Sequence, residues 1–370
     1  MKKYLFENKI LTVPVIVLVI LGLVSAAVWR LSVAYVEISD FFTGTLSFAL
    51  RFVLTRATYF IPFSLAEIML FACAPLFIFI LVRLITAKKK RTALLKLLTR
   101  AAAVWGAFMF VFTFTLGVCY GKSPVNTKMG FERRLISSDD LYAAMEILTG
   151  ELNEIAASID YTRSESTKMP YGFRELSNKL NGAYKNMLGK YKLFNRINAR
   201  AKPAVISELM SRMHITGVYS FFTGEANVNV GFPDYSVVYA AAHEMAHLMG
   251  VGREDEANFV AFLVCIHSGD DYIRYSGLAN MSEYIGGALY RANSDKYIEA
   301  MAAMPEVVIN ERAAYSKFFD KYRDTQISQV ASAVNNTYLK AQGQEEGVKS
   351  YGLVVDFAVA YLLEVYKNEK

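Results

Sequence analysis

Two histidines flank a glutamate in the segment HEMAH, residues 243–247, and these side chains have the types and spacing of a metal-dependent catalyst. Residues four apart lie on one face of a helix, so His243 and His247 can bind one zinc ion through their imidazoles. Glu244 is placed to take a proton from a water molecule beside the metal. The alternative is a pair of ordinary histidines on an amphipathic helix. The chain has only four histidines, which makes this spacing hard to explain by chance.

The residues after the motif predict a sharp turn and a second helix. Gly250 and Gly252 stand where the motif helix should end, because glycine accepts the left-handed conformation of a helix C-cap. The acidic run at residues 254–256 then suits the positive N-terminal end of a helix that reaches about residue 267. Such a turn can bring a carboxylate to the metal.

Three carboxylates compete for the place of third ligand. Glu254 is preferred, because it begins a stripe of small or polar side chains, at residues 254, 258, 261 and 265, that lets the two helices approach closely. Glu256 lies about 200° around the helix from Glu254, so both cannot face the metal. Glu256 is the alternative, followed by Asp255. Asn258 is expected either to orient a ligand by a hydrogen bond or to be a solvated polar residue.

Three apolar segments, residues 10–30, 61–87 and 97–120, are each near the length of about 20 residues that crosses a bilayer. Six Lys and Arg residues lie between positions 88 and 100, and short basic loops of this kind stay in the cytoplasm. The chain after residue 120 should therefore be extracytoplasmic. The first segment could instead be a cleaved signal peptide, because small residues occupy positions 25–27. Glu67 is expected to lie at the interface or to pair with an arginine, rather than to act as an intramembrane acid.

These patterns predict an α+β fold that is mainly α. Residues 1–120 form a membrane anchor of three transmembrane helices, and residues 121–370 form an extracytoplasmic domain with a small sheet. Helices are expected at residues 141–157, 172–191 and 204–213 and in about six segments after residue 236. Strand character is confined to residues 215–230, where apolar and polar side chains alternate.

Charge and cysteine content exclude two classes of protein. Residues 1–120 contain 13 Lys and Arg against 4 Asp and Glu, whereas residues 121–370 contain 27 against 30, so the outer part has no basic footprint for nucleic acid. The three cysteines do not have the number or spacing of a disulfide framework. A lipid bilayer and a peptide or protein substrate are the expected partners.

The motif region resembles known zinc peptidases. The metzincin pattern HExxHxxGxxH matches through Gly250 and then fails, because Arg253 stands at the third histidine and a guanidinium does not ligate zinc. The gluzincins, in which a downstream Glu is the third ligand, are more similar. Residues 254–258 resemble the Glu-x-x-Ala-Asp pattern of membrane-bound gluzincins related to the CAAX-processing and heat-shock membrane proteases. Asn258 replaces the usual Asp, and the gap after HExxH is shorter.

Nearly the whole chain is similar to a bacterial family of membrane-anchored zinc peptidases that is labelled a domain of unknown function. The shared blocks are IPFSLAEI from residue 61, GEANVNV from 224, AAHEMAHLMG from 241, REDEANF from 253 and YLKAQGQEEGVKSYG from 338. The resemblance implies a zincin-like domain, a multi-pass location in the bacterial cell membrane and a Zn²⁺ cofactor. It names no substrate.

We therefore expect a zinc metallopeptidase in which His243, His247 and Glu254 bind the metal and Glu244 is the general base. A further donor should stabilise the oxyanion, and Tyr351 is the first candidate because it lies in the last shared block. Tyr275 and His267 are the alternatives.

Two further expectations concern the substrate strand and a competing function. The resemblance to zincins implies that residues 225–230 are an edge strand whose backbone binds extended peptide, although an ordinary structural hairpin fits equally well. The competing function is a catalytically inactive zincin-like scaffold or sensor in the membrane. Glu244 argues against it, because a purely structural zinc site needs no base beside its first ligand.

Overall fold

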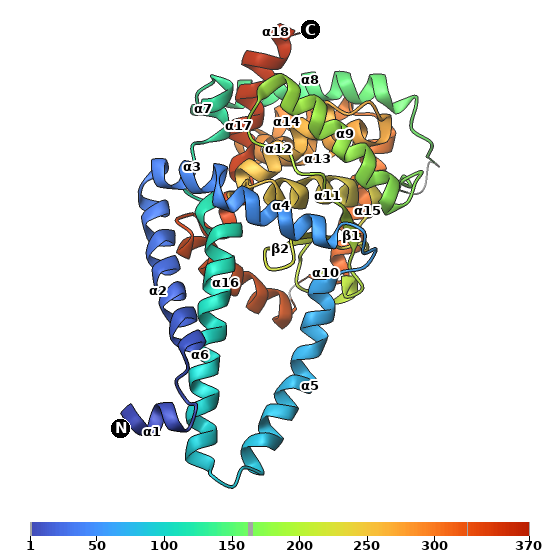
Figure 1. The fold of residues 1–370 in the computed structure, drawn as a ribbon. Coiled ribbons are helices and arrows are strands. Elements are labelled where there is room, and N and C mark those ends of the chain that lie inside the picture. The colour runs from blue at the N-terminus through green and yellow to red at the C-terminus, as the bar shows by residue number, and fades with distance from the viewer. Residues whose placement is uncertain (1, 162–165, 324, 370) are drawn as a thin grey trace.

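The computed structural model describes residues 2–161, 166–323 and 325–369. Figure 1 shows a mainly helical body from which long N-terminal helices project to one side. A small three-stranded sheet belongs to the body. The predicted combination of a mainly helical fold, a small sheet and three apolar N-terminal helices is confirmed.

The N-terminal part combines three long apolar helices with several shorter ones. α2, α5 and α6 with its 3-10 extension η1 are 22, 21 and 30 residues long, and each is apolar enough to cross a membrane. The bounds are α1 (Lys2–Glu7), α2 (Val13–Ala34), α3 (Val36–Gly44), α4 (Leu46–Thr58), α5 (Leu65–Ile85), α6 (Lys90–Thr115) and η1 (Gly117–Cys119). The sequence located all three apolar helices but placed the start of the third too late, because the basic residues 90–96 are helical as well.

The apolar helices do not form a closed bundle. α2 and α6 pack along each other, and Gly22 faces Gly106 so closely that a Cβ on either glycine would overlap the backbone of the other helix. α5 and α6 meet at the loop of residues 86–89 and diverge toward the body (Figure 1). α3 and α4 run across the upper ends of α2 and α6 toward the start of α5.

The sheet has the order β1-β3-β2. β1 (Ala201–Pro203) pairs in parallel with β3 (Glu225–Val228), and β2 (Gly217–Ser220) pairs with β3 in an antiparallel register that aligns Tyr219 with Ala226. Both sides of β3 are therefore occupied. The prediction that residues 225–230 form an edge strand for substrate is wrong, because the edges of this sheet are β1 and β2.

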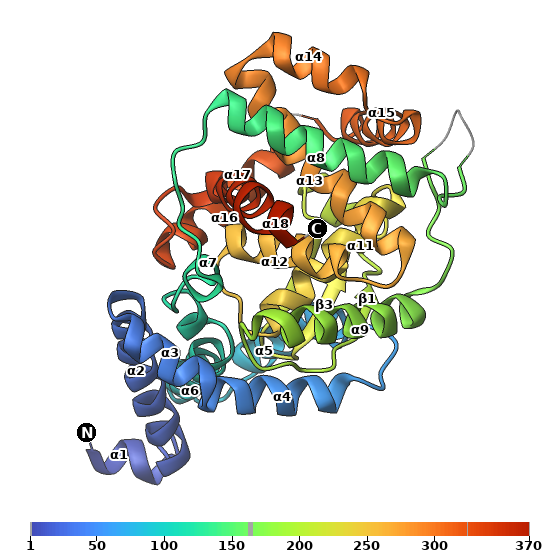
Figure 2. The same cartoon turned by 90° about the horizontal axis from the view of Figure 1, so that it is seen from above.

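The body consists of short and medium helices around two central ones, α11 and α12 (Figure 2). Those that precede or flank the sheet are α7 (Val125–Met129), α8 (Ser138–Ala156), α9 (Phe173–Tyr191) and α10 (Ser207–Arg212). Those that follow it are α11 (Asp234–Leu248), α12 (Glu254–Ile266), α13 (Asp271–Ala292), α14 (Ser294–Ala302), α15 (Glu306–Asp320), α16 (Gln326–Ala341), the 3-10 helix η2 (Gly347–Leu353), α17 (Val354–Ala360), the π-helical η3 (Tyr361–Tyr366) and α18 (Lys367–Glu369). The helices predicted at 141–157, 172–191 and 204–213 correspond to α8, α9 and a shorter α10.

Two carboxylates join the N-terminal helices to the body, and each binds backbone amides of the other part. Glu225, at the start of β3, accepts hydrogen bonds from the backbone N–H groups of residues 65 and 66 in the first turn of α5, at 3.1 and 3.0 Å. Glu67 of α5 accepts hydrogen bonds from the N–H groups of residues 205 and 206 in the body, at 3.1 and 2.9 Å. Of the two expectations for Glu67, an interfacial position or an arginine partner, the pairing with arginine is not found among the described residues, where Glu67 binds backbone amides.

Buried cations and a shared core strengthen this junction. Lys202 of β1 pairs with Glu225 and donates a hydrogen bond to the carbonyl of Thr58 at 3.1 Å. Arg51 of α4 donates one to the carbonyl of Leu248 at 3.2 Å. The apolar core of the body also continues into the end of the third apolar helix, through residues 112, 116 and 120. A division at residue 120 stays a prediction, and these contacts cross it.

Candidate metal centre

Helix α11 carries the HEMAH motif through the centre of the body. Residues 235–248 are all buried, and alanines at positions 240–242 and 246 let neighbouring elements approach the helix closely. α12, α13, β2 and β3 surround it. Polar side chains in such a place are costly unless they bind a partner, so the buried His243, Glu244 and His247 require one.

The turn between α11 and α12 has the form that the two glycines predicted. α11 ends at Leu248, and Gly250 adopts the left-handed conformation with φ +92°. A Cβ on Gly252 would lie 2.6–2.7 Å from the backbone at Cys119, so only glycine fits there. The chain therefore reverses tightly and starts α12 at Glu254, as predicted.

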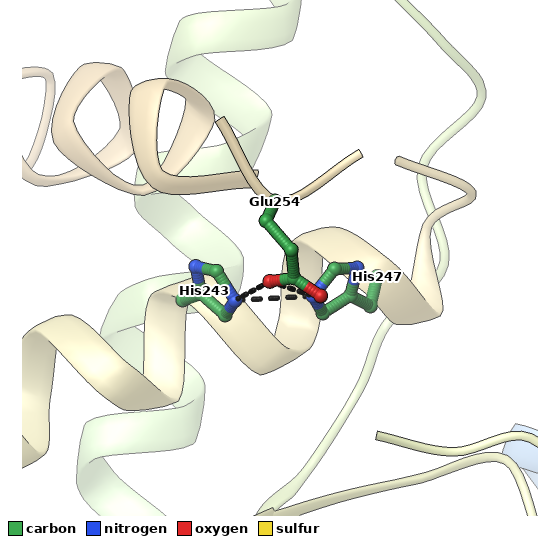
Figure 3. Close-up of side chains that lie close together, drawn as sticks. All are labelled: His243, His247 and Glu254. Atoms are coloured by element: carbon green, nitrogen blue, oxygen red, sulfur yellow. Dashed lines mark hydrogen bonds and ion pairs between the residues drawn. The ribbon is translucent and has the colours of Figure 1, made fainter. Parts of the chain in front are cut away.

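His243, His247 and Glu254 converge at this turn (Figure 3). The two Nε2 atoms lie 3.0 Å apart, and one carboxylate oxygen of Glu254 lies 3.2 Å from Nε2 of His243 and 3.4 Å from Nε2 of His247. Zinc bonds of 2.0–2.1 Å at tetrahedral angles require donor atoms about 3.3–3.4 Å apart. The three donor atoms therefore have separations close to those of a zinc site.

Hydrogen bonds from neighbouring residues fix the ring of His247 and the backbone of Glu254. Nδ1 of His247 lies 2.7 Å from the carbonyl of Val251, which directs Nε2 toward Glu254. The side-chain carbonyl of Gln344 accepts a hydrogen bond from the backbone N–H of Glu254 at 3.3 Å. Burial alone would raise the pKa of Glu254, but the two histidines hold it well below its usual range. Burial alone would lower the pKa of His247, but the Glu254 carboxylate raises it to about 9.

Glu244 lies on the same helix but outside this cluster, against strand β2. It is only 4% exposed, and a Cβ on Gly217 would come within 2.6 Å of its carboxylate. The backbone of Tyr219 in β2 also donates a hydrogen bond to it. Burial raises the pKa of Glu244, and the two histidines oppose that rise. A carboxyl of raised pKa close to a metal site suits a group that accepts and returns a proton.

The competing carboxylates point elsewhere. Glu256 accepts a hydrogen bond from the backbone N–H of Val125 at 3.2 Å, and burial raises its pKa. Asp255 pairs with Arg133 and Arg253, each at 3.3 Å. Glu254 is thus the acidic residue that the fold brings to the histidines.

The sequence also offered three candidates for the donor that stabilises the oxyanion, namely Tyr351, His267 and Tyr275. The side chain of Tyr351 lies outside the described residues. His267 caps the far end of α12, about 20 Å along the helix from Glu254, and bonds to the carbonyl of Leu263. Tyr275 is buried on α13 beside Tyr272.

A cavity of about 300 Å³ opens beside His243. Asn258 lines it, and no hydrogen bond joins Asn258 to a histidine or to Glu254 among the described residues. Nδ1 of His243 and the side-chain nitrogen of Asn258 are buried without a described partner.

Sequence reasoning missed two tyrosines and a glutamine near the centre. Tyr284 of α13 lines the same cavity as His243, and burial and the nearby Glu283 and Glu254 charges raise its pKa, so it remains a hydrogen-bond donor. Tyr338 of α16 is close enough for Glu254 to raise its pKa in addition to burial. Tyr338 and Gln344 belong to the last of the blocks from which the resemblance was drawn, which was the available signal, whereas nothing in the pattern marks Tyr284.

Comparison with known proteins adds one match. A family described as "Protein of unknown function (DUF3810)" matches residues 43–359. This range takes in α4, two of the three apolar helices and nearly all of the body. No curated protein and no solved structure matches the chain.

Proposed function

Because the chain belongs to DUF3810, a family whose function is unknown, its activity has to be inferred from the site, and we propose that it is a membrane-anchored zinc metallopeptidase. The observation that carries the proposal is the convergence of His243, His247 and Glu254 at zinc-like separations, with Glu244 beside them on the same helix. Two imidazoles and one carboxylate leave a fourth position open, as catalytic zinc sites do.

The residues divide the chemistry of amide hydrolysis between them. His243, His247 and Glu254 would hold the metal, which when bound lowers the pKa of water and polarises a carbonyl. Glu244 accepts the proton of the attacking water and passes it to the leaving amine. Tyr284, which lines the cavity beside His243, would donate a hydrogen bond to the developing oxyanion. The cavity itself would receive a substrate side chain.

We further propose that the body faces the outside of the cell. The basic residues 88–100 lie at the end of α5 and α6 that is remote from the body (Figure 1). If this end is cytoplasmic, as the distribution of basic loops predicts, the metal centre is extracytoplasmic.

A scaffold that keeps zinc only for structure is the competing proposal. A structural zinc site usually closes its fourth position with a Cys or His, and no such residue joins the three donors among the described residues. Glu244 would have no role in such a scaffold.

The test uses the full-length protein in detergent micelles. We expect one zinc per chain by elemental mass spectrometry, loss of that zinc in His247→Ala and Glu254→Ala, and no loss in the control His267→Ala. Glu244→Gln should keep the zinc and lose at least 10²-fold in cleavage of a fluorogenic peptide library. A protein that folds but binds no zinc would refute the proposal, and one in which Glu244→Gln cleaves normally would refute the base.

A further inference from the structure

A second cavity, of about 530 Å³, lies between the anchor and the body, apart from the metal centre. Helices α3 and α4 form one wall. The end of α9 with residues 192–195, Lys122 before α7 and Lys128 near the end of α7 line the rest. Its volume is that of a site for a small molecule rather than for a single water. The proposed hydrolysis does not use it.

Positive charge dominates the lining of this basic cavity. Arg51, Lys122, Lys128 and Lys192 line it, against one carboxylate, Asp40. Asp40 is already engaged, because its two oxygens accept hydrogen bonds from the backbone N–H and the hydroxyl of Ser123. The lining therefore holds four cations against the one carboxylate of Asp40, with Glu256 as a further acidic charge near Lys122.

Two of these cations are buried, which makes their convergence costly. Lys122 is 5% exposed, and its ammonium lies over the ring of Phe194 at 5.3 Å with no described carboxylate within ion-pair distance. Burial lowers the pKa of Lys122, and the neighbouring charges of Lys128 and Arg51 lower it further against the opposing effect of Glu256. Such a group is stabilised by an anion from outside the chain.

Arg51 is 1% exposed and also keeps donors for a ligand. Its guanidinium donates to the hydroxyl and carbonyl of Ser47 and to the carbonyls of Thr43 and Leu248. These bonds use three of its five N–H groups, so N–H groups on both terminal nitrogens remain. A planar guanidinium beside lysine ammoniums is the donor set that binds phosphate oxygens best.

We propose that this basic cavity binds the phosphate group of a small anionic molecule, through Arg51, Lys122, Lys128 and Lys192. The cavity lies level with the ends of the apolar helices, because α3 starts two residues after α2 ends and Lys122 comes three residues after η1. Either an anionic lipid headgroup or a soluble phosphate could supply the group at this level. The ligand would share Arg51 with the carbonyl of Leu248, which adjoins the proposed zinc ligand His247.

The test is native mass spectrometry of the full-length protein released from detergent, titrated with dioctanoyl phosphatidylglycerol, dioctanoyl glycerol or inorganic phosphate. We expect one phosphate-bearing ligand per chain. Its Kd should rise by at least tenfold in Lys122→Gln and in the double variant Lys128→Gln/Lys192→Gln, whose two side chains are exposed and therefore tolerate replacement. The matched control is Lys88→Gln/Lys89→Gln, which removes the same charge at the other end of the apolar helices and should leave the Kd unchanged.

The outcomes also separate the two sources of phosphate. Weakened binding of phosphatidylglycerol alone identifies a lipid headgroup, and weakened binding of inorganic phosphate as well identifies a site for soluble phosphate compounds. Equal Kd values in the wild type and both cavity variants for every probe would overturn the proposal. Binding of dioctanoyl glycerol as tight as that of phosphatidylglycerol would overturn it too, because that lipid has no phosphate.

Discussion

Replacing Gly217 with alanine places a methyl group where the Glu244 carboxylate now lies. The new Cβ would be 2.6 Å from Oε1 and Cγ of Glu244. An ordinary contact is about 3.4 Å or more, so the carboxylate has to move by about 0.8 Å. A displacement near 1 Å costs a catalytic group about 10²-fold in rate, or about 2.7 kcal/mol. We therefore expect kcat/KM for peptide cleavage to fall about 10²-fold in Gly217→Ala.

The same variant should leave the metal and the fold intact. The three atoms nearest to the methyl group all belong to the side chain of Glu244, and none belongs to His243, His247 or Glu254. Zinc content should therefore remain one per chain, and the melting temperature should change little. Gly269→Ala is the control, because a Cβ there meets nothing within 4 Å. A Gly217→Ala protein that cleaves peptide at the wild-type rate would show that Glu244 does not act from its observed position. Loss of zinc would show that β2 supports the ligands instead.

Three further predictions test the fold. Lys202→Met should lower the free energy of unfolding by about 3–5 kcal/mol in denaturant titrations, because it leaves the Glu225 charge buried without its partner, and a loss below 1 kcal/mol would contradict that burial. Burial raises the pKa of Glu311 from 4.5 to about 7, so the stability that this carboxyl contributes is full below pH 4.5 and is lost as the pH rises through 7, a change of about 3 kcal/mol. Melting curves at pH 5 and pH 8 should show this decline in the wild type and a smaller one in Glu311→Gln; an identical decline in both would exclude Glu311 as its source. Gly22→Leu should separate α2 from α6 at Gly106 and lower the melting temperature of the detergent-solubilised protein, and an unchanged melting temperature would show that the close approach contributes nothing.

The local geometry of the candidate site was predictable because it depends on residues close in the sequence. The four-residue spacing of the histidines sets their common helix face, and Gly250 sets the reversal that starts α12 at Glu254. The preference for Glu254 over Glu256 followed from the stripe of small or polar side chains that Glu254 begins, and their angular separation on one helix showed that both cannot face the metal. Each of these inferences spans fewer than about 15 residues, over which helix periodicity is a dependable guide.

The misses at the sheet and around the metal centre depend on contacts between distant residues. β1 has only three residues and ends in a proline, so no local pattern marked it, and without it β3 was taken for an edge strand. Gln344 reaches the backbone of Glu254 from 90 residues away, and Arg51 reaches α11 from the anchor. One sequence contains no signal for such pairings, because they are decided by how the helices pack.

The hydrogen bonds of Glu67 and Glu225 fix the position of the body relative to the N-terminal helices, which a flexible linker would not do. A domain on a flexible linker samples many heights above a bilayer. Here β3 is hydrogen-bonded to the first turn of α5, and α5 is hydrogen-bonded in return to residues 205 and 206 of the body. If α5 crosses a membrane as proposed, the body would stay at one height above it. If the protein hydrolyses peptides as proposed above, only a peptide bond at a certain distance from the membrane surface would reach the metal centre. The proposed peptidase would then select substrates first by this distance and only afterwards by the side chains around the bond.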